Sequence, residues 1–367
     1  MTLEQGALLQ DRYRIIEVLG HGGMGSIYRA VDENLGLEVA VKENLFTVED
    51  YTKQFKREAV ILASLRHPNL PRVSNHFSIP DQGQYLIMDY IEGEDLQERM
   101  ERDKVIPEEE VIIIGATICD ALTYMHSRDP VVLHRDIKPG NVRITPRGDI
   151  YLVDFGLAKI IRGDKTTTTG ARAMTMGFSP PEQYGAARTD VRTDIYSLGA
   201  TLYTALTGST PEDSLAQTMD QERLTPVRER NPSVSRRVGE AVEKALNVHP
   251  NDRFQMAAEF KNELLKARSG RFVFGLHDKL PPSPPQEKGQ KGSDGGDRVI
   301  TKELNLRKIP GDGSGGKREM GEKDGSGIRI NSKGCLNMLL FLVIILVLGV
   351  VVLSMLTPAL VHQFFGF

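Results

Sequence analysis

The chain has 367 residues, of which 40% are hydrophobic and 26% charged, and its formal net charge is −3 at pH 7. This composition excludes collagen-like, disulfide-stapled and wholly disordered proteins, and the small net charge gives no reason to expect nucleic acid as a partner. Cys119 and Cys335 are too few for a disulfide framework, and no Cys/His cluster has the spacing of a zinc site. Residues 1–269 alternate between strand and helix patterns and are expected to form the globular part.

The first motif is a glycine-rich segment between two extended segments. Gly20, Gly22 and Gly25 follow the pattern G-x-G-x-x-G. A Walker A loop requires a Lys after the last glycine, and a dinucleotide-binding loop requires a helix there; neither is present. Residues 14–19 and 26–31 both look extended, so we expect a hairpin whose backbone amides can approach phosphate closely. A simple glycine-rich turn is the alternative that this segment alone leaves open.

A strand that ends in a lysine follows the hairpin, and a helix follows that strand. Residues 38–42 form the strand, and residues 47–65 are predicted to form the helix. Glu58 falls within the apolar stripe of this helix. A carboxylate on a buried face requires a cationic partner, and Lys42 on the adjacent strand is the candidate.

The second half of the globular region contains three further motifs. They are His134–Asn141 (HRDIKPGN), Asp154-Phe155-Gly156 and Pro180-Pro181-Glu182. Their Asp and Asn residues could be ordinary turn residues if each motif stood alone. With the glycine loop, the strand lysine and the helix glutamate, however, they resemble a protein kinase in order and approximate spacing. The resemblance is to bacterial eukaryotic-like (Hanks-type) serine/threonine protein kinases and covers residues 13 to about 265.

The resemblance implies an α+β fold with two lobes. A β-rich N-lobe would comprise about residues 13–88, and a helical C-lobe would comprise about residues 92–269. Residues 1–12 would be an N-terminal extension.

The resemblance also implies catalytic roles, since phosphoryl transfer requires positioned phosphates, neutralised charge and an aligned hydroxyl. Asp136 would orient the substrate hydroxyl and accept its proton, and Lys138 would lie at the γ-phosphate of ATP. Asn141 and Asp154 would hold Mg²⁺, or alternatively Mn²⁺. Lys138 together with Thr175 points to Ser or Thr rather than Tyr acceptors.

The residues implied in nucleotide binding lie in the N-lobe and at the hinge between the lobes. The glycines would cover the phosphates, and Lys42, held by Glu58, would bind the α- and β-phosphates. Met88 would be the gatekeeper residue before the hinge. The full set is Gly20, Gly22, Gly25, Ile27, Ala40, Lys42, Glu58, Met88, Asp89 and Ile91.

A threonine run between the Asp-Phe-Gly and Pro-Pro-Glu motifs suggests regulation. Arg135, directly before the catalytic aspartate, is typical of kinases that activation-loop phosphorylation controls. A phosphate on the run would add about −2 charge and could pair with Arg135. The run consists of Thr166, Thr167, Thr168 and Thr169, and the sequence does not single out one of them.

The last hundred residues divide into a polar segment and an apolar one. Residues 270–335 are rich in Gly, Pro and charges and are expected to be a disordered linker. Residues 336–356 carry no charge and, as a helix, would cross about 30 Å of hydrocarbon, so we predict a transmembrane helix. Residues 357–367 would be a short extracytoplasmic tail. Lys and Arg precede the apolar segment and none follow it, which places the kinase domain in the cytoplasm.

The sequence therefore predicts an ATP-dependent serine/threonine protein kinase held in the plasma (cell) membrane by one span. The expected partners are ATP, proteins with Ser or Thr acceptors and the lipid bilayer at residues 336–356; the protein could also form a homodimer. A membrane-anchored pseudokinase scaffold is the alternative, against which the complete set of catalytic residues argues. A small-molecule phosphotransferase is disfavoured by the full activation segment.

Overall fold

The computed structural model describes residues 3–22, 25–45, 49–80, 82–154, 160–161, 175–184, 189–268 and 280; within them, the side chains of residues 49–54, 58, 160–161 and 268 are excluded. In this part of the chain, no helix is long and apolar enough to cross a membrane. The expected transmembrane helix at 336–356 and most of the expected linker lie outside the described residues.

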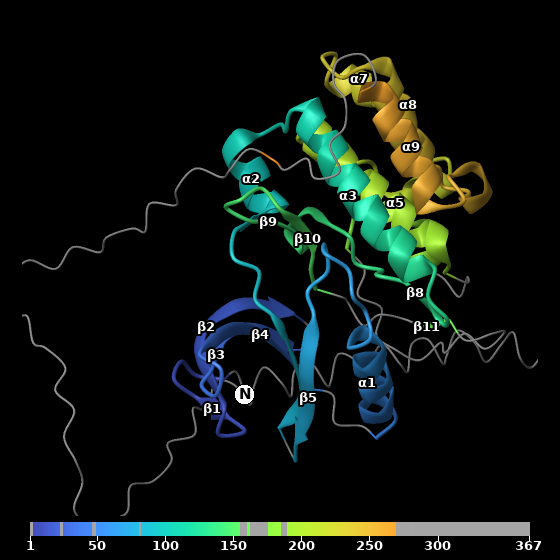
Figure 1. Ribbon diagram of the computed structural model, residues 1–367. Helices are drawn as coiled ribbons and strands as arrows, with labels where there is room; N and C mark the ends of the chain where they lie inside the picture. Colours follow the sequence, from blue (N-terminus) through green and yellow to red (C-terminus); the bar gives the residue numbers. More distant parts are fainter. Residues whose placement is uncertain are drawn as a thin grey trace, which may run out of the picture. The chain divides into compact units, whose positions relative to one another are not determined.

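The N-lobe is an antiparallel sheet with strand order β1-β2-β3-β4-β6-β5 (Figure 1). The hairpin of β2 and β3 extends to the pair Gly22 and Gly25, which confirms the predicted glycine hairpin. After β4 comes α1 (Glu49–Leu62), which ends three residues earlier than predicted because residues 63 and 64 form a turn. The strands are β1 (Leu8–Leu9), β2 (Tyr13–Gly22), β3 (Gly25–Asp32), β4 (Leu37–Asn44), β5 (Val73–Ile79) and β6 (Gly83–Asp89).

The two faces of this sheet have different surroundings. Successive side chains of a strand point to opposite faces. In β4, Val39 and Val41 belong to a hydrophobic cluster confined to the N-lobe. Ala40 belongs instead to the cluster that continues into the C-lobe. Lys42, two residues after Ala40, therefore points toward the C-lobe.

The residues before β2 form part of this lobe. Strand β1 pairs with β2, and Leu9 is 4% exposed. The backbone amide of Leu3 donates to the hydroxyl of Tyr28 at 3.0 Å. Residues 3–12, expected as an extension, thus add an edge strand to the sheet.

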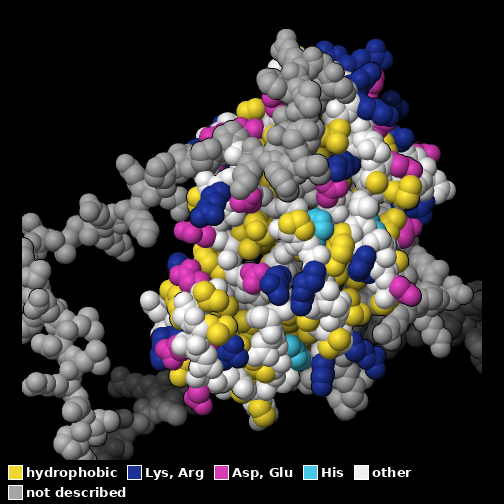
Figure 2. Space-filling view, viewed as in Figure 1, with side chains coloured by type: hydrophobic (Ala, Val, Ile, Leu, Met, Phe, Trp, Pro, Cys, Tyr) yellow, Lys and Arg dark blue, Asp and Glu magenta, His cyan; other side chains and the backbone are white. Residues whose placement is uncertain are grey.

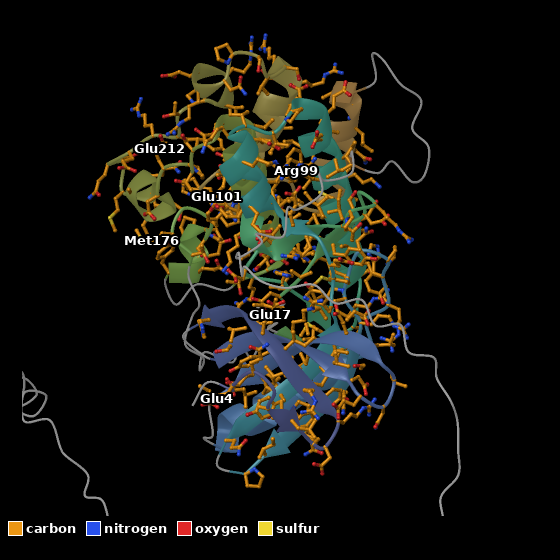
Figure 3. All side chains as sticks on the ribbon, turned by 90° about the vertical axis from the view of Figure 1, so that its left-hand side faces the viewer. Glu4, Glu17, Arg99, Glu101, Met176 and Glu212 are labelled. Carbon is orange, nitrogen blue, oxygen red and sulfur yellow. The ribbon has the colours of Figure 1, made fainter. Side chains whose placement is uncertain are left out.

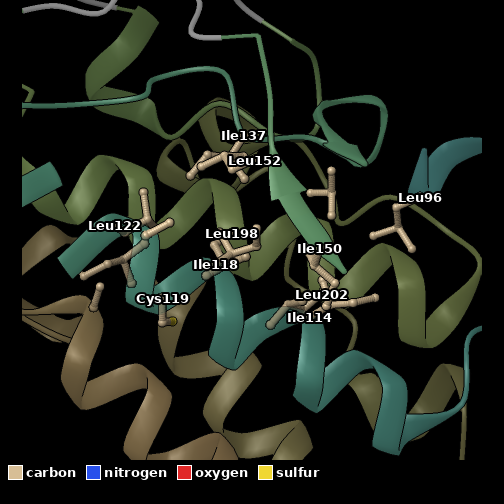
Figure 4. Close-up of a cluster of buried hydrophobic side chains, with 14 of the residues drawn as sticks. Leu96, Ile114, Ile118, Cys119, Leu122, Ile137, Ile150, Leu152, Leu198 and Leu202 are labelled. Atoms are coloured by element: carbon tan, nitrogen blue, oxygen red, sulfur yellow. The ribbon is translucent and has the colours of Figure 1, made fainter. Parts of the chain in front are cut away.

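The C-lobe is helical around α3 and α5. Helix α3 is apolar around most of its circumference, as expected for a helix covered on all sides. Its Ile114, Ile118 and Leu122 pack against α5, which contributes Leu198 and Leu202 (Figure 4). The helices are α2 (Leu96–Asp103), α3 (Glu108–His126), α4 (Pro181–Tyr184), α5 (Val191–Thr207), α6 (Ser214–Thr218), α7 (Val227–Arg230), α8 (Arg236–Ala245) and α9 (Ala257–Arg268).

Short strands and 3₁₀ turns complete the lobe at the side that faces the sheet. The strands β7 (Glu94–Asp95), β9 (Val142–Ile144) and β10 (Ile150–Leu152) form one sheet. Strands β8 (Val131–Val132) and β11 (Ile160–Ile161) pair separately. The 3₁₀ turns are Pro139–Asn141 and Pro250–Asp252. Cys119 of α3 is fully buried and free, and burial raises the pKa of its thiol, as is typical of a structural cysteine.

The surface view shows hydrophobic, basic and acidic side chains intermingled on the face toward the viewer (Figure 2). The exposed apolar residues include single methionines and leucines at turns or loops, such as Leu35 and Met219. Isolated exposed apolar side chains of this kind are normal for a folded domain.

Leu280 lies in the segment expected to be a disordered linker, yet it is packed in the hydrophobic core. Leu280 is 2% exposed and belongs to the same hydrophobic cluster as Ile144 and Ile150, which flank the β9–β10 turn. Its backbone amide donates to the carbonyl of Gly148 at 3.1 Å. Gly148 has φ +79°, and a Cβ on it would overlap the backbone of Leu280, so only glycine permits this approach. Leu280 thus attaches the chain after α9 to the C-lobe.

Replacement of Leu280 by Ala is expected to lower the free energy of unfolding by about 2–3 kcal/mol, because it removes a buried side chain. Urea unfolding of the wild type and the variant measures this. The matched control is Val60→Ala, which truncates a side chain that is 65% exposed and should change little. Equal effects of the two variants would show that Leu280 is not packed in solution.

Candidate active site

A lysine and an aspartate that are far apart in the sequence form an ion pair between the lobes. The Nζ atom of Lys42, on β4, lies 2.5 Å from Oδ1 of Asp154, which follows β10. Burial alone would raise the pKa of Asp154, but the Lys42 ammonium outweighs it and holds that pKa below its ordinary value. The expected partner Glu58 has its side chain outside the described residues, so that pairing stays a prediction.

Asp154 is held in an unusual backbone conformation. Its φ is +53°, in the left-handed region that side-chain-bearing residues rarely adopt. The preceding residue, Val153, donates its amide to the carbonyl of Asn141 at 2.9 Å. Such conformations persist only where the surroundings enforce them, and they occur mainly at functional sites. Phe155 and Gly156 of the same motif lie outside the described residues.

The carboxylate of Asp136 collects three hydrogen bonds. Its Oδ2 accepts from Nζ of Lys138 at 2.8 Å and from Nδ2 of Asn141 at 3.1 Å. Its Oδ1 accepts from the hydroxyl of Thr175 at 2.9 Å. The 3₁₀ turn Pro139–Asn141 folds the chain back so that Asn141 reaches Asp136. The three predicted catalytic residues therefore do meet at one carboxylate.

A buried aspartate fixes the backbone of the loop that carries Asp136. Asp194, in the first turn of α5, is fully buried and accepts the amides of His134 at 2.9 Å and Arg135 at 2.8 Å. His126 also bonds to it, with Nε2 at 2.9 Å. Arg135 has φ +70°, and the two amide bonds to Asp194 hold this strained conformation.

Two residues of this arrangement were not predicted from the sequence. His126 ends α3, and Gln183 follows the Pro-Pro-Glu motif and donates to the carbonyl of Arg135 at 2.9 Å. The only sequence signal for Gln183 is its position next to that motif. Nearby, Glu182 of the same motif forms a buried ion pair with Arg253, at 2.7 and 3.0 Å.

Five of the residues predicted to bind the nucleotide share one face of the N-lobe sheet: Gly20, Ile27, Ala40, Lys42 and Met88. Residues directly opposite one another on antiparallel strands point to the same face. Ile27 lies opposite both Gly20 and Lys42, and Ala40 lies opposite Met88. This is the face from which Lys42 reaches the C-lobe. Met88 is 6% exposed and is also part of the hydrophobic core.

The backbone at the hinge and in the glycine loop bears on the predicted nucleotide site. Asp89 ends β6, and its carboxylate accepts the amide of Arg72 at 3.0 Å. The amide of Ile91 has no backbone hydrogen-bond partner in the described part of the chain. Gly25 has φ +150°, and a Cβ there would overlap the carbonyl of Glu43, which explains the glycine.

The two predicted metal ligands offer oxygen atoms. The side-chain nitrogen of Asn141 donates to Asp136, so its side-chain oxygen is the atom that could bind a metal ion. In Asp154, Lys42 binds Oδ1, and Oδ2 is the second candidate ligand atom. Mg²⁺ prefers oxygen ligands and takes few of them from protein, the remainder being water and phosphate. No group of three or more His, Cys, Asp or Glu suited to a metal occurs among the described residues. The donor set fits Mg²⁺.

The segment that leads into the Pro-Pro-Glu motif reaches the site through Thr175. The next residue, Met176, is 80% exposed and lies at the surface of the C-lobe (Figure 3). The four predicted phosphorylation sites, Thr166 to Thr169, lie outside the described residues.

Acid is expected to destabilise the fold through His134. Burial lowers the pKa of this imidazole from 6.5, so below pH 6.5 the unfolded chain binds a proton that the folded chain does not. Stability should therefore fall as the pH drops below 6.5, by at most about 1.4 kcal/mol per pH unit for this group. Urea unfolding between pH 8 and pH 5.5 tests this, and His134→Gln should flatten the dependence. An unchanged slope in the variant would contradict the assignment.

The comparisons with known proteins agree with this geometry. Residues 13–265 match the protein kinase domain family. The serine/threonine-protein kinase PknB of Mycobacterium leprae is 33% identical over 291 residues, which cover 76% of this chain and 45% of the relative. The probable serine/threonine-protein kinase CPE1738 of Clostridium perfringens is 31% identical over 271 residues, covering 72% and 39%.

Solved structures show the same fold. The crystal structure of the Mycobacterium tuberculosis PknI kinase domain superposes with a TM-score of 0.58 and 26% identity, covering 73% of this chain and all of that one. The chain spans less than half the length of the two curated relatives named above. The family match over most of the chain settles its membership: it belongs to the protein kinase family and is homologous to bacterial serine/threonine-protein kinases.

Proposed function

We propose that this protein transfers the γ-phosphate of ATP to Ser or Thr hydroxyls of other proteins. The observation that carries the proposal is the convergence on Asp136 of Lys138, Asn141 and the hydroxyl of Thr175. A second support is the ion pair of Lys42 with Asp154, which brings the N-lobe sheet to the same site.

Each group of the site has a chemical task in this reaction. Asp136 aligns the acceptor hydroxyl and takes its proton as the oxygen forms a bond to the γ-phosphorus. The bond from the γ-phosphorus to the β–γ bridging oxygen breaks, and ADP leaves. The Lys138 ammonium would offset negative charge at the transferred phosphoryl group, and Lys42 would bind the α- and β-phosphates. Mg²⁺, held by Asn141 and Asp154, would supply charge neutralisation at the phosphates.

Thr175 supports a Ser or Thr acceptor. Its hydroxyl donates to Oδ1 of Asp136, so an aliphatic hydroxyl is already accommodated beside this carboxylate. We propose that an acceptor Ser or Thr is aligned by the same carboxylate.

The pseudokinase scaffold is the alternative function. Such a scaffold needs a nucleotide pocket but has no requirement for an aligned proton acceptor. The three hydrogen bonds on Asp136 therefore favour the enzyme. We further propose autophosphorylation within the run Thr166 to Thr169, with Arg135 as the partner of the phosphate.

We propose that the kinase domain is cytoplasmic and that residues 336–356 anchor it in the plasma membrane. The support is the sequence, in which these residues carry no charge and the basic residues lie only on their N-terminal side. A shared membrane would also raise the local concentration of a second copy, which favours a homodimer.

Asp136→Asn is expected to lower kcat by about 10³-fold, because the amide cannot accept the proton. Phosphate transfer from Mg-ATP to the chain itself and to a generic protein acceptor measures it, with phosphoserine and phosphothreonine identified by mass spectrometry. Asp120→Asn is the matched control, since Asp120 pairs with Lys261 on the outside of α3. Nucleotide binding without transfer by the wild-type full chain in membranes would instead support the scaffold.

Deletion of residues 336–356 is expected to move the protein from the membrane pellet to the supernatant. Fractionation of cells with a carbonate wash measures the distribution. A wild-type chain that alkaline carbonate extracts completely would contradict the transmembrane assignment.

A further inference from the structure

A carboxylate is buried directly behind the lysine of the site. Glu43 follows Lys42 on β4, is 3% exposed and points to the opposite face of the sheet. That face is otherwise packed with aromatic and aliphatic side chains. Within the described part of the chain, no Lys or Arg forms an ion pair with Glu43. Burial of a carboxylate without a cation is costly, so its presence here requires a reason.

Two tyrosines bind this carboxylate, one from each neighbouring strand. The hydroxyl of Tyr28, on β3, donates to Oε2 of Glu43 at 3.0 Å. The hydroxyl of Tyr85, on β6, donates to Oε1 at 3.2 Å. Burial raises the pKa of both tyrosines, and the Glu43 carboxylate raises it further. Both hydroxyls therefore stay protonated and act as donors to Glu43.

These bonds fasten the end of β4 from both sides. Tyr85 lies directly opposite Glu43, and Tyr28 lies opposite Val41, two residues before it. The backbone of Gly25 also lies against the carbonyl of Glu43, so the glycine loop contacts the same point. The chain leaves the sheet immediately after this point, because β4 ends at Asn44. The two bonds thus add to the backbone ladder in holding the terminal residues of the strand.

The N-terminal segment extends the network. The amide of Leu3 donates to the Tyr28 hydroxyl, which in turn donates to Glu43. A chain of hydrogen bonds thus runs from the N-terminal segment to the residue next to Lys42. Hydrogen bonds linked in this way polarise and strengthen one another in a buried setting.

We propose that Glu43 is a positioning residue for Lys42. From the opposite face of the strand it fixes the backbone from which the lysine reaches Asp154 and the phosphates of ATP. This inference rests on the proposed function, because it assigns Lys42 to the nucleotide. It adds a residue that makes no contact with the nucleotide face of the sheet.

The test compares Glu43→Leu with Glu43→Gln in the full chain. Glu43→Leu removes both acceptors, so the KM for ATP and the dissociation constant of Mg-ATP should rise about tenfold, since small misplacements of a binding group are costly. Glu43→Gln keeps an acceptor for one tyrosine and can donate to the other, so it should restore most of the affinity. Calorimetric titration with Mg-ATP measures binding without any need for phosphate transfer.

The matched control is Tyr13→Phe. Tyr13 belongs to the same cluster, and its hydroxyl accepts from Asn75 rather than touching β4, so its loss should leave the affinity for Mg-ATP unchanged. If Glu43→Leu fails to fold, Tyr85→Phe removes one of the two bonds with no change of shape and should raise the dissociation constant in the same direction.

A fall in melting temperature with unchanged Mg-ATP affinity in these variants would overturn the inference and leave Glu43 a structural residue only. Failure of the proposed function has a different signature. The wild type would then transfer no phosphate, whereas the comparison of Mg-ATP affinities between wild type and variants would still decide the role of Glu43. If the wild type bound no Mg-ATP, both would be refuted.

Discussion

The catalytic loop depends on one buried carboxylate. Asp194 has no exposed surface. Its carboxylate oxygens form hydrogen bonds with the amides of His134 and Arg135 and with the ring of His126. Burial by itself would raise the pKa of Asp194, but these partners hold it below its ordinary value, so the group stays ionised and its hydrogen bonds stay strong. They keep Arg135 in a left-handed conformation, and the next residue is Asp136. The backbone that leads into Asp136 is thus fixed from the first turn of helix α5.

The same use of buried charge recurs at two other places, with different partners. Glu182 is matched by the guanidinium of Arg253, so neither charge is left alone and the segment after the activation loop is fixed to the C-lobe. Among the described residues, the Glu43 side chain is bound by the neutral hydroxyls of Tyr28 and Tyr85. The contrast is informative, because a matched pair is explained by the fold, whereas a carboxylate among tyrosines beside Lys42 is explained by the position of that lysine.

Most elements of the fold could be predicted from local patterns. The strand–glycine–strand hairpin, the strand of Lys42 and the apolar helices α3 and α5 follow from periodicity and from the absence of a helix after the glycines. The end of α1 was predicted three residues too late, because Leu65 is buried outside the helix and so continues its apolar pattern. Leu280 could not be predicted, since a single leucine among Pro, Gly and charged residues carries no periodicity.

The sequence by itself determined the order of the elements and the family, and its resemblance to protein kinases implied the roles of Asp136, Lys138 and Asn141. The tertiary structure decided which distant groups meet. Lys42 and Asp154 are 112 residues apart, and only the packing of the lobes joins them. The positions of Gln183 and Glu43 around the site were decided in the same way. Such pairings depend on which face of each element is buried and on what covers it, and a linear pattern does not contain that information.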